Sequence, residues 1–297
     1  MARRSIGISG ISGDSAAAQA YVAGAEALGW IVRPEGVGID VVVPAPLAST
    51  LALADALVEA GGRRAFGWPL ITTAAVQELL RRAPSVGAVT NLSSRSTRPA
   101  PTVALPAGAS LSGGVLLHSA HDQIALTMIV ARLVGLGAPR SVSASVGLGA
   151  NGLDDTADVA IEFVGGRTAR VHADWQSESV TSQEFQLAGE AGVLRSETDP
   201  RLSLEFNGEQ VWLPAANVAG EQHRPLHESG VVAMLKTIAA AFDAGTLPYA
   251  FTLAFGRDVL EVIVAAYASA GNREPVALPF DGNRDATPQR LLAGSAT

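Results

Sequence analysis

Three residues near the middle of the chain have side chains that can move protons. His118, His121 and Asp122 end the stretch Ser112-Gly-Gly-Val-Leu-Leu-His-Ser-Ala-His-Asp122. If residues 119–130 form a helix, the two histidines lie on one face of it and Asp122 lies one turn from His118. An imidazole, with an ordinary pKa of about 6.5, can take a proton from a hydroxyl group at neutral pH while a carboxylate orients the ring. The pattern indicates general acid–base chemistry.

Other interpretations of the histidines remain open. The pair could instead pack in the core or face solvent at the start of a helix. No third metal ligand is evident nearby, so the sequence predicts no metal site. His223 and His227 flank Pro225 in a segment that is typical of a solvated loop. His172 lies on a predicted strand near Asp174, where it could line a substrate pocket or a dimer contact.

The first part of the chain alternates strand-like and helix-like segments. Strands are predicted at 5–9, 39–43 and 63–66, and helices at 15–28, 47–60 and from Thr72 or Thr73 through 82. Gly29 and Gly61 are suitable residues to follow a helix. Strands that alternate with helices at this spacing indicate βαβ units and a parallel sheet.

The second part of the chain is predicted to be mainly strands after one long helix within 112–134. The pairs Gly165-Gly166 and Asn207-Gly208 are hairpin turn signals and indicate a mostly antiparallel sheet. Helical patterns return at 230–242 and 255–269. The segment 91–112 is rich in Ser, Pro and Ala and is predicted to be a loop.

The pattern therefore predicts an α/β protein with two domains. Residues 1–84 would form a truncated Rossmann-like parallel sheet. Residues 85–297 would form an α+β substrate and oligomerisation domain with a large, mostly antiparallel open sheet, and residues 270–297 could pack back on the first domain.

Composition excludes several classes of protein. The 297 residues include no cysteine, which removes disulfides, thiolate nucleophiles and cysteine-based zinc sites. A formal net charge of −7 and the lack of a basic tract argue against nucleic acid as a direct partner. No apolar run approaches the roughly 18 residues of a membrane span, and the N-terminus lacks a signal-peptide core. We expect a cytoplasmic protein that binds a small molecule and contacts no membrane.

The order of motifs resembles the Gfo/Idh/MocA oxidoreductase family. Ile39-Asp-Val-Val-Val-Pro-Ala-Pro46 resembles the family strand under the nicotinamide cofactor, and Gly67-Trp-Pro-Leu70 falls where most members carry Glu-Lys-Pro-Leu. The histidine stretch is similar to the family segment "GGG.l.D.g.HdiD". Residues 266–279 resemble the closing helix and strand, so the resemblance covers most of the chain.

The resemblance implies a cofactor, a base and an assembly. NAD or NADP would bind near Gly7, Gly10, Gly13, Pro44 and Trp68, the first three being the glycines of the dinucleotide loop. His121 matches the catalytic histidine if one residue is deleted, and His118 then takes the place of the usual Asp. The open sheet would form the contact of a homodimer or homotetramer.

The chain also departs from the family pattern in three ways. Ser12 stands at the second glycine of the dinucleotide motif if Gly10 is the first, and Asp14 places a negative charge beside the phosphates. The segment before Ile39 is too short for a further βαβ passage. Glu35 is a possible acid for the ribose, but it lies after Pro34 in a Gly-rich loop. Trp68 replaces the usual Lys, as in a subgroup with Glu-Trp-Pro-Leu. It could stack on a flat ring or plug the strand end as a core aromatic residue.

Three functions are compatible with these residues. The first is an NAD(P)-dependent oxidoreductase that acts on a hydroxyl or carbonyl group of a polyol-, sugar- or secondary-metabolite-like substrate. The second is a relative that has lost the dinucleotide and performs proton transfer as an isomerase, dehydratase or cyclase. The third is a ligand sensor without catalysis. The degenerate cofactor site favours the last two, and the resemblance favours the first.

Overall fold

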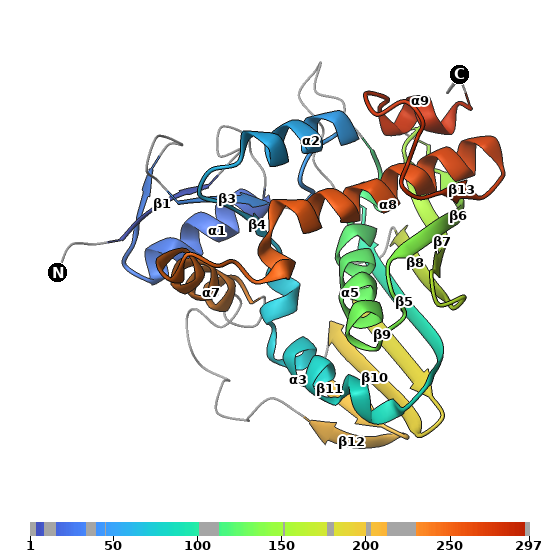
Figure 1. The fold of residues 1–297 in the computed structure, drawn as a ribbon, viewed down its shortest axis with the longest axis horizontal. Coiled ribbons are helices and arrows are strands. Elements are labelled where there is room, and N and C mark those ends of the chain that lie inside the picture. Colours follow the sequence, from blue (N-terminus) through green and yellow to red (C-terminus); the bar gives the residue numbers. More distant parts are fainter. Residues whose placement is uncertain are drawn as a thin grey trace.

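The fold consists of two sheets joined by helices (Figure 1). The structure is a computed structural model, and it describes residues 4–8, 16–33, 40–44, 46–100, 113–150, 152–176, 181–199, 203–212 and 230–294. The predicted α/β architecture, a Rossmann-like parallel sheet followed by a larger sheet, is confirmed.

The first sheet has four parallel strands in the order β2-β1-β3-β4. Their bounds are β1 (Ser5–Ile8), β2 (Ile31–Arg33), β3 (Val41–Pro44) and β4 (Arg64–Gly67). Strand β2 was not expected, because three residues at a sheet edge leave almost no periodic pattern to read. Along the chain, residues 34–40 separate β2 from β3.

Three helices lie beside the first sheet, namely α1 (Ala16–Ala27), α2 (Leu51–Ala60) and α7 (Val231–Ala244), while α3 (Ala74–Arg82) packs on strands of the second sheet. Thr50 caps α2 and Thr73 caps α3, each by accepting a backbone N–H three residues further on. Helix α7 comes late in the sequence but packs against α1, so the chain returns to the first sheet after the second is built (Figure 1).

The second sheet has nine strands in the order β12-β11-β10-β9-β5-β8-β7-β6-β13. Its neighbours are antiparallel except β5 and β8, which are parallel. The strands are β5 (Val89–Pro99), β6 (Pro139–Leu148), β7 (Asp154–Phe163), β8 (Thr168–Gln176), β9 (Ser182–Gly189), β10 (Gly192–Asp199), β11 (Ser203–Phe206), β12 (Glu209–Trp212) and β13 (Val276–Ala277).

The prediction of a loop at 91–112 is wrong for its first part. Residues 89–99 form β5, which lies between β8 and β9 in the middle of the second sheet. Its inward side chains include Leu92, Ser94 and Ser96, and both serines are buried. Small hydroxyl groups facing the core do not give the apolar alternation by which a strand is recognised. Residues 101–112 lie outside the described part of the chain.

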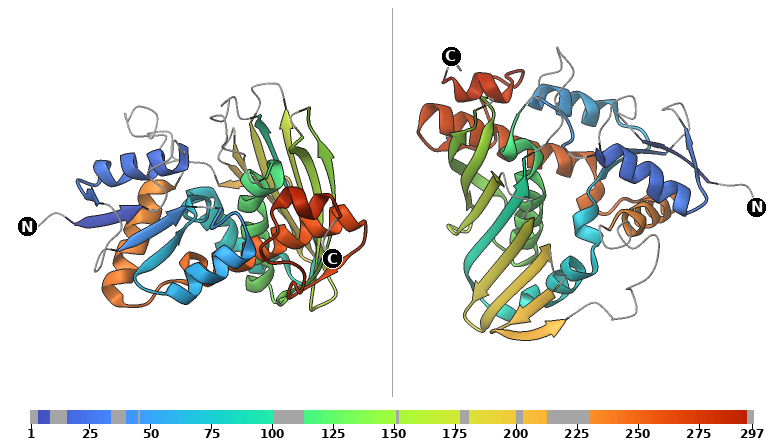
Figure 2. Two further views of the ribbon diagram at one scale, coloured as in Figure 1. Left: turned by 90° about the horizontal axis from the view of Figure 1, so that it is seen from above. Right: turned by 180° about the vertical axis from the view of Figure 1, so that it is seen from behind.

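The predicted long helix is divided at Ser119. Helix α4 (Val115–His118) and helix α5 (Ala120–Leu133) meet there, and the Trp175 indole N–H donates a hydrogen bond of 2.8 Å to the Ser119 hydroxyl. Helix α5 packs on β5 and β8 and covers one face of the second sheet (Figure 2). His118 therefore ends α4, and His121 and Asp122 lie in the first turn of α5.

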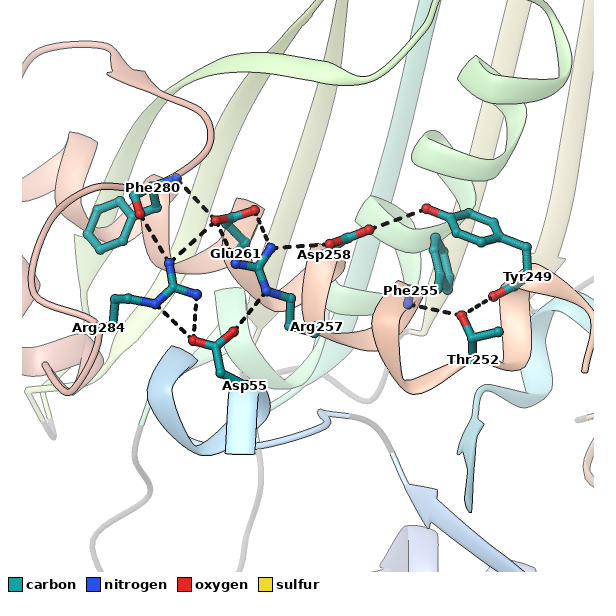
Figure 3. Close-up of polar contacts among 9 residues, drawn as sticks. All are labelled: Asp55, Tyr249, Thr252, Phe255, Arg257, Asp258, Glu261, Phe280 and Arg284. Carbon is teal, nitrogen blue, oxygen red and sulfur yellow. Dashed lines mark hydrogen bonds and ion pairs between the residues drawn. The ribbon is translucent and has the colours of Figure 1, made fainter. Parts of the chain in front are cut away.

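Helix α8 (Leu253–Asn272) connects the two halves of the fold. It packs on α2 beside the first sheet and on β6 of the second, and α9 (Pro288–Leu292) packs on its far end. Charged side chains join these elements (Figure 3). Arg257 of α8 lies 3.1 Å from Asp55 of α2 and 2.6 Å from Glu261, and Arg284 also bonds to Asp55. Arg257 thus ties α2 to α8.

We predict that Arg257→Met lowers the free energy of unfolding by about 3 kcal/mol, because the mostly buried Glu261 loses its close guanidinium partner and Asp55 keeps only Arg284. Urea unfolding measures the change. The control is Arg81→Met, which breaks the exposed pair with Glu78 on α3 and should cost under about 1 kcal/mol. Equal losses in the two variants would contradict a special role for Arg257.

Candidate functional site

The candidate site centres on Asp122, in the first turn of α5. Its Oδ1 lies 3.1 Å from His121 Nε2, and its Oδ2 accepts a hydrogen bond of 3.3 Å from Arg98 Nη2 of β5. The Asp122 side chain is 15% exposed and that of Arg98 is 34% exposed. The carboxylate therefore sits at the inner end of the site, with Arg98 nearer to solvent.

The electrostatic surroundings keep Asp122 ionised. Burial alone would raise the pKa of Asp122, but the positive charge and hydrogen bond of His121, the charge of Arg98 and the Trp68 N–H together hold it well below its ordinary value. An aspartate with so low a pKa cannot act as a general acid near neutral pH. An ionised carboxylate in this place can orient the imidazole beside it and stabilise its protonated form.

The structure brings both predicted histidines to this place. His121 is 8% exposed, and its Nδ1 has no hydrogen-bond partner among the described residues. His118, at the end of α4, also has a buried Nε2 without a partner there. Burial, and then the proximity of His121, lower the pKa of His118 to about 4. His118 is therefore neutral at pH 7, and its ring can serve as a hydrogen-bonding group.

Trp68 immediately follows β4 and lies in the core. Its side chain is fully buried and its ring packs against Phe255 at 5.8 Å between centroids. The indole N–H makes no regular hydrogen bond, yet it acts on the Asp122 carboxylate strongly enough to lower its pKa. The sequence left two roles open for Trp68, stacking on a flat ring or plugging the strand end. Its complete burial at the end of β4 fits the second role, that of a core aromatic residue.

Gly67 leaves room for a tyrosine beside Trp68. A Cβ at position 67 would lie 2.7 Å from the Tyr21 ring and 2.8 Å from Val42. The Tyr21 hydroxyl donates a 2.9 Å hydrogen bond to the Gly67 carbonyl. Burial and the nearby Asp122 charge raise the pKa of Tyr21, so this phenol stays protonated. Tyr21 and Trp68 together fill the corner at the end of β4.

Two of the predicted cofactor-binding glycines lie outside the described residues, and the other predicted residues lie in or just after strands of the first sheet. Gly7 lies in β1, and its N–H donates a 2.7 Å hydrogen bond to the Asp40 carbonyl. Pro44 ends β3 directly beside Gly67. Gly10 and Gly13 lie outside the described residues, as do Glu35, His223 and His227.

Two residues of the site were missed from the sequence. Arg98 was hidden because its strand was interpreted as a loop, and the alternation Ser94, Ser96, Arg98 on one face of β5 is the signal that could have revealed it. Tyr21 lies in an Ala-rich helical segment and has no motif around it. Nothing in the local pattern indicates that its hydroxyl reaches β4.

His172 belongs to a separate polar cluster. Its Nδ1 lies 2.7 Å from Asp158 and its Nε2 lies 3.1 Å from Asp174, which also accepts hydrogen bonds from Arg95 and Thr97. Arg95 and Arg98 point to opposite faces of β5, since they are three residues apart on a strand. The His172 cluster is therefore on the face of the sheet opposite α5.

The site thus has the parts for proton transfer. His121 is held by an ionised carboxylate, a guanidinium balances the charge, and a neutral imidazole stands beside them. The described ranges contain no group of three or more His, Asp or Glu side chains arranged to hold a metal ion. Within the same ranges, no helix has both the length and the apolar character required to cross a bilayer.

Comparisons with known proteins show which family and which solved structures the chain resembles. Residues 74–195 match the family model described as GFO/IDH/MocA C-terminal domain. No curated protein sequence matches the chain. Several solved structures share its fold over nearly the full length of both chains.

Three of these structures illustrate the likeness. GenD2 from gentamicin A biosynthesis, in complex with NAD, is 17% identical with a TM-score of 0.70 over 94% of this chain and 97% of its own. A myo-inositol dehydrogenase from Corynebacterium glutamicum is 16% identical with a TM-score of 0.68 over 94% and 99%. Levoglucosan dehydrogenase, in complex with NADH and L-sorbose, is 15% identical with a TM-score of 0.69 over 94% and 100%.

The lowered pKa of His118 predicts a specific pH dependence of stability. Between pH 6.5 and 4 the unfolded chain binds a proton at His118 that the folded chain does not, so stability is lost as the pH falls through this window. We expect the wild type to lose about 2 kcal/mol more than His118→Gln between pH 7 and 4.5. Urea unfolding across this range tests the difference, and identical pH profiles would contradict the burial of a neutral His118.

Proposed function

We propose that the chain is a Gfo/Idh/MocA-type oxidoreductase that acts on a hydroxyl or carbonyl group of a small polyol-, sugar- or secondary-metabolite-like substrate. The match of residues 74–195 and the full-length likeness to sugar and polyol dehydrogenases support the reaction class. The observation that carries the proposal is the contact of His121 with the ionised Asp122 beside the end of the first sheet.

His121 is the acid–base group in this proposal. In the oxidation of an alcohol it takes the hydroxyl proton, and in the reverse direction it returns that proton to the carbonyl oxygen. Asp122 holds the imidazole and stabilises its protonated form, and Arg98 balances the carboxylate charge in the resting state. His118, neutral at working pH, donates or accepts a hydrogen bond to a substrate hydroxyl group.

A bound NAD or NADP would supply the hydride acceptor. In parallel α/β sheets, ligands bind beyond the carboxyl ends of the strands, where the strand order reverses. In this sheet the strand order reverses at β1, which lies between β2 and β3. Trp68, directly after β4, faces Asp122, so the carboxyl ends of the strands lie near the proposed acid–base group. Gly7 and Pro44, at the ends of β1 and β3, are the described residues that would contact the cofactor.

One observation favours a second candidate, a relative that performs proton transfer without a dinucleotide. Tyr21 and Trp68 fill the corner where the resemblance places a lysine, and neither can carry a positive charge. The first sheet also ends at β2 among the described residues, with no further strand beside it for the adenosine half. Isomerisation or dehydration would use the same His121, Asp122 and Arg98.

We also propose that the two-domain division lies near residue 84 and that copies of the chain associate through the open face of the second sheet. That face carries the His172 cluster and the ion pair of Arg195 with Glu184. Light scattering on the purified protein would give the mass of the assembly, and a monomer at micromolar concentration would exclude the proposed contact.

Dinucleotide binding separates the two candidate functions. We predict that NAD(H) or NADP(H) at millimolar concentration raises the thermal unfolding midpoint of the wild type by several degrees, because a ligand that binds only the folded state stabilises it. His121→Gln should show the same rise, since this residue is assigned to chemistry. If neither dinucleotide shifts the midpoint, the oxidoreductase proposal fails and the proton-transfer candidate remains.

Turnover is predicted to depend on His121. With a panel of polyols and aldoses, nicotinamide absorbance should report oxidation by the wild type, and His121→Gln should lower kcat on the order of a hundredfold or more. His172→Gln, on the opposite face of the sheet, is the control and should retain wild-type rates. Unchanged turnover in His121→Gln would assign the acid–base role to another residue.

A further inference from the structure

The segment that carries the histidines begins at a buried carboxylate. We propose that Asp154 and Tyr267 are positioning residues, which fix the start of α4 and thereby place His118, His121 and Asp122. Asp154 opens β7 of the second sheet, and Tyr267 lies on α8. The inference rests on the proposed role of the histidine segment and applies to both candidate functions.

The Asp154 carboxylate accepts hydrogen bonds from this segment and from Tyr267. Its carboxylate receives the backbone N–H of Gly114 and the backbone N–H of Leu116, both at 2.8 Å. The Tyr267 hydroxyl donates to the same carboxylate at 3.0 and 3.1 Å. Asp154 is 1% exposed. These hydrogen-bond donors stabilise the buried carboxylate in place of a positively charged partner.

The close approach is possible because position 114 is glycine. A Cβ on Gly114 would lie 2.0 Å from the Asp154 carbonyl oxygen and 2.5 Å from Oδ1. A Cβ on Gly113 would lie 2.9 Å from the Tyr267 hydroxyl oxygen. The sequence Gly113-Gly114 thus allows the backbone to lie directly against Asp154 and Tyr267.

Helix α4 depends on these contacts for its position. It has four residues, far fewer than a helix needs to be stable alone. It is held at its start by Asp154 and just after its end by the hydrogen bond from Trp175 to Ser119. His118 is the last residue of α4, and His121 follows within the first turn of α5. A shift at Gly114 would therefore move both histidines.

The Tyr267 hydroxyl stays protonated while the groups of the site titrate. Burial and the Asp154 charge raise the pKa of Tyr267 well above its ordinary value, so its hydroxyl remains a donor at any working pH. The His118 ring is different, since its pKa of about 4 reflects how well the ring is buried. The titration of His118 therefore reports the position of α4 without any need for substrate or cofactor.

The experiment compares two variants that disturb the start of α4 with one control variant. Asp154→Asn keeps the shape but removes the charge and one acceptor, and Tyr267→Phe removes only the hydroxyl. The matched control is Ser269→Ala, which removes another buried hydroxyl of α8, one that accepts the Ala144 N–H at 3.0 Å on the side of β6. The His118 pKa is followed by NMR of the ring C–H, assigned with His118→Gln.

We expect the His118 pKa to rise by about one unit or more in Tyr267→Phe and in Asp154→Asn, as water reaches the ring, and to stay unchanged in Ser269→Ala. An unchanged His118 pKa in folded Tyr267→Phe would overturn the inference. If Asp154→Asn does not fold, Tyr267→Phe alone tests whether the start of α4 positions His118.

Turnover adds a second readout that keeps the two proposals apart. Where the wild type oxidises a polyol, Tyr267→Phe should lower kcat on the order of tenfold or more with little change in KM, because misplaced acid–base groups slow the chemical step. If the wild type shows no turnover, the oxidoreductase proposal fails while the His118 titration still tests the role of Asp154 and Tyr267. A raised His118 pKa with wild-type kcat would limit these two residues to a structural role and overturn the inference.

Discussion

The carboxylate of Asp122 is the point at which the two sheets of this protein meet. Arg98 reaches it from the centre of the second sheet, Trp68 faces it from the end of the first, and His121 lies against it from the same helix turn. A largely buried carboxylate is tolerated only when it is neutralised and hydrogen-bonded. The contacts around Asp122 therefore constrain the relative position of β4, β5 and α5.

The surrounding residues fit that constraint. Gly67 has no side chain, so Tyr21 can pack at the end of β4 and hold its carbonyl. Trp68 fills the remaining space and stacks on Phe255 of α8. On the far side, Asp154 holds the start of α4, so that the histidine segment enters the site from a fixed point. The proposed acid–base group, His121, is thus supported from both sheets. Among the described residues that fill the corner after β4, Tyr21 is protonated and Trp68 is not ionisable.

Much of this could be predicted from the sequence, and the failures have a common physical cause. The apolar run 41–43 predicted β3, and the hairpin glycines predicted antiparallel strands. Thr72 or Thr73 predicted the start of α3. Each of these signals is local in the sequence. His118, His121 and Asp122 could be proposed because titratable side chains so close together on one helix are unusual, and the structure brings the three together. Arg98 was missed because β5 faces the core with serines, and Tyr21 and Asp154 were missed because their partners are distant in the sequence.

The most direct test of the proposed site is whether Asp122 stays ionised in the folded protein. The carboxyl carbon of Asp122 can be followed by NMR from pH 7 to pH 3 in protein labelled at aspartate, with Asp122→Asn to assign the signal. We expect this signal to remain that of an ionised carboxylate well below the ordinary aspartate pKa of about 3.9, because His121 and Arg98 outweigh burial. A carboxyl group that titrates at or above that value would contradict the arrangement on which the proposed chemistry depends.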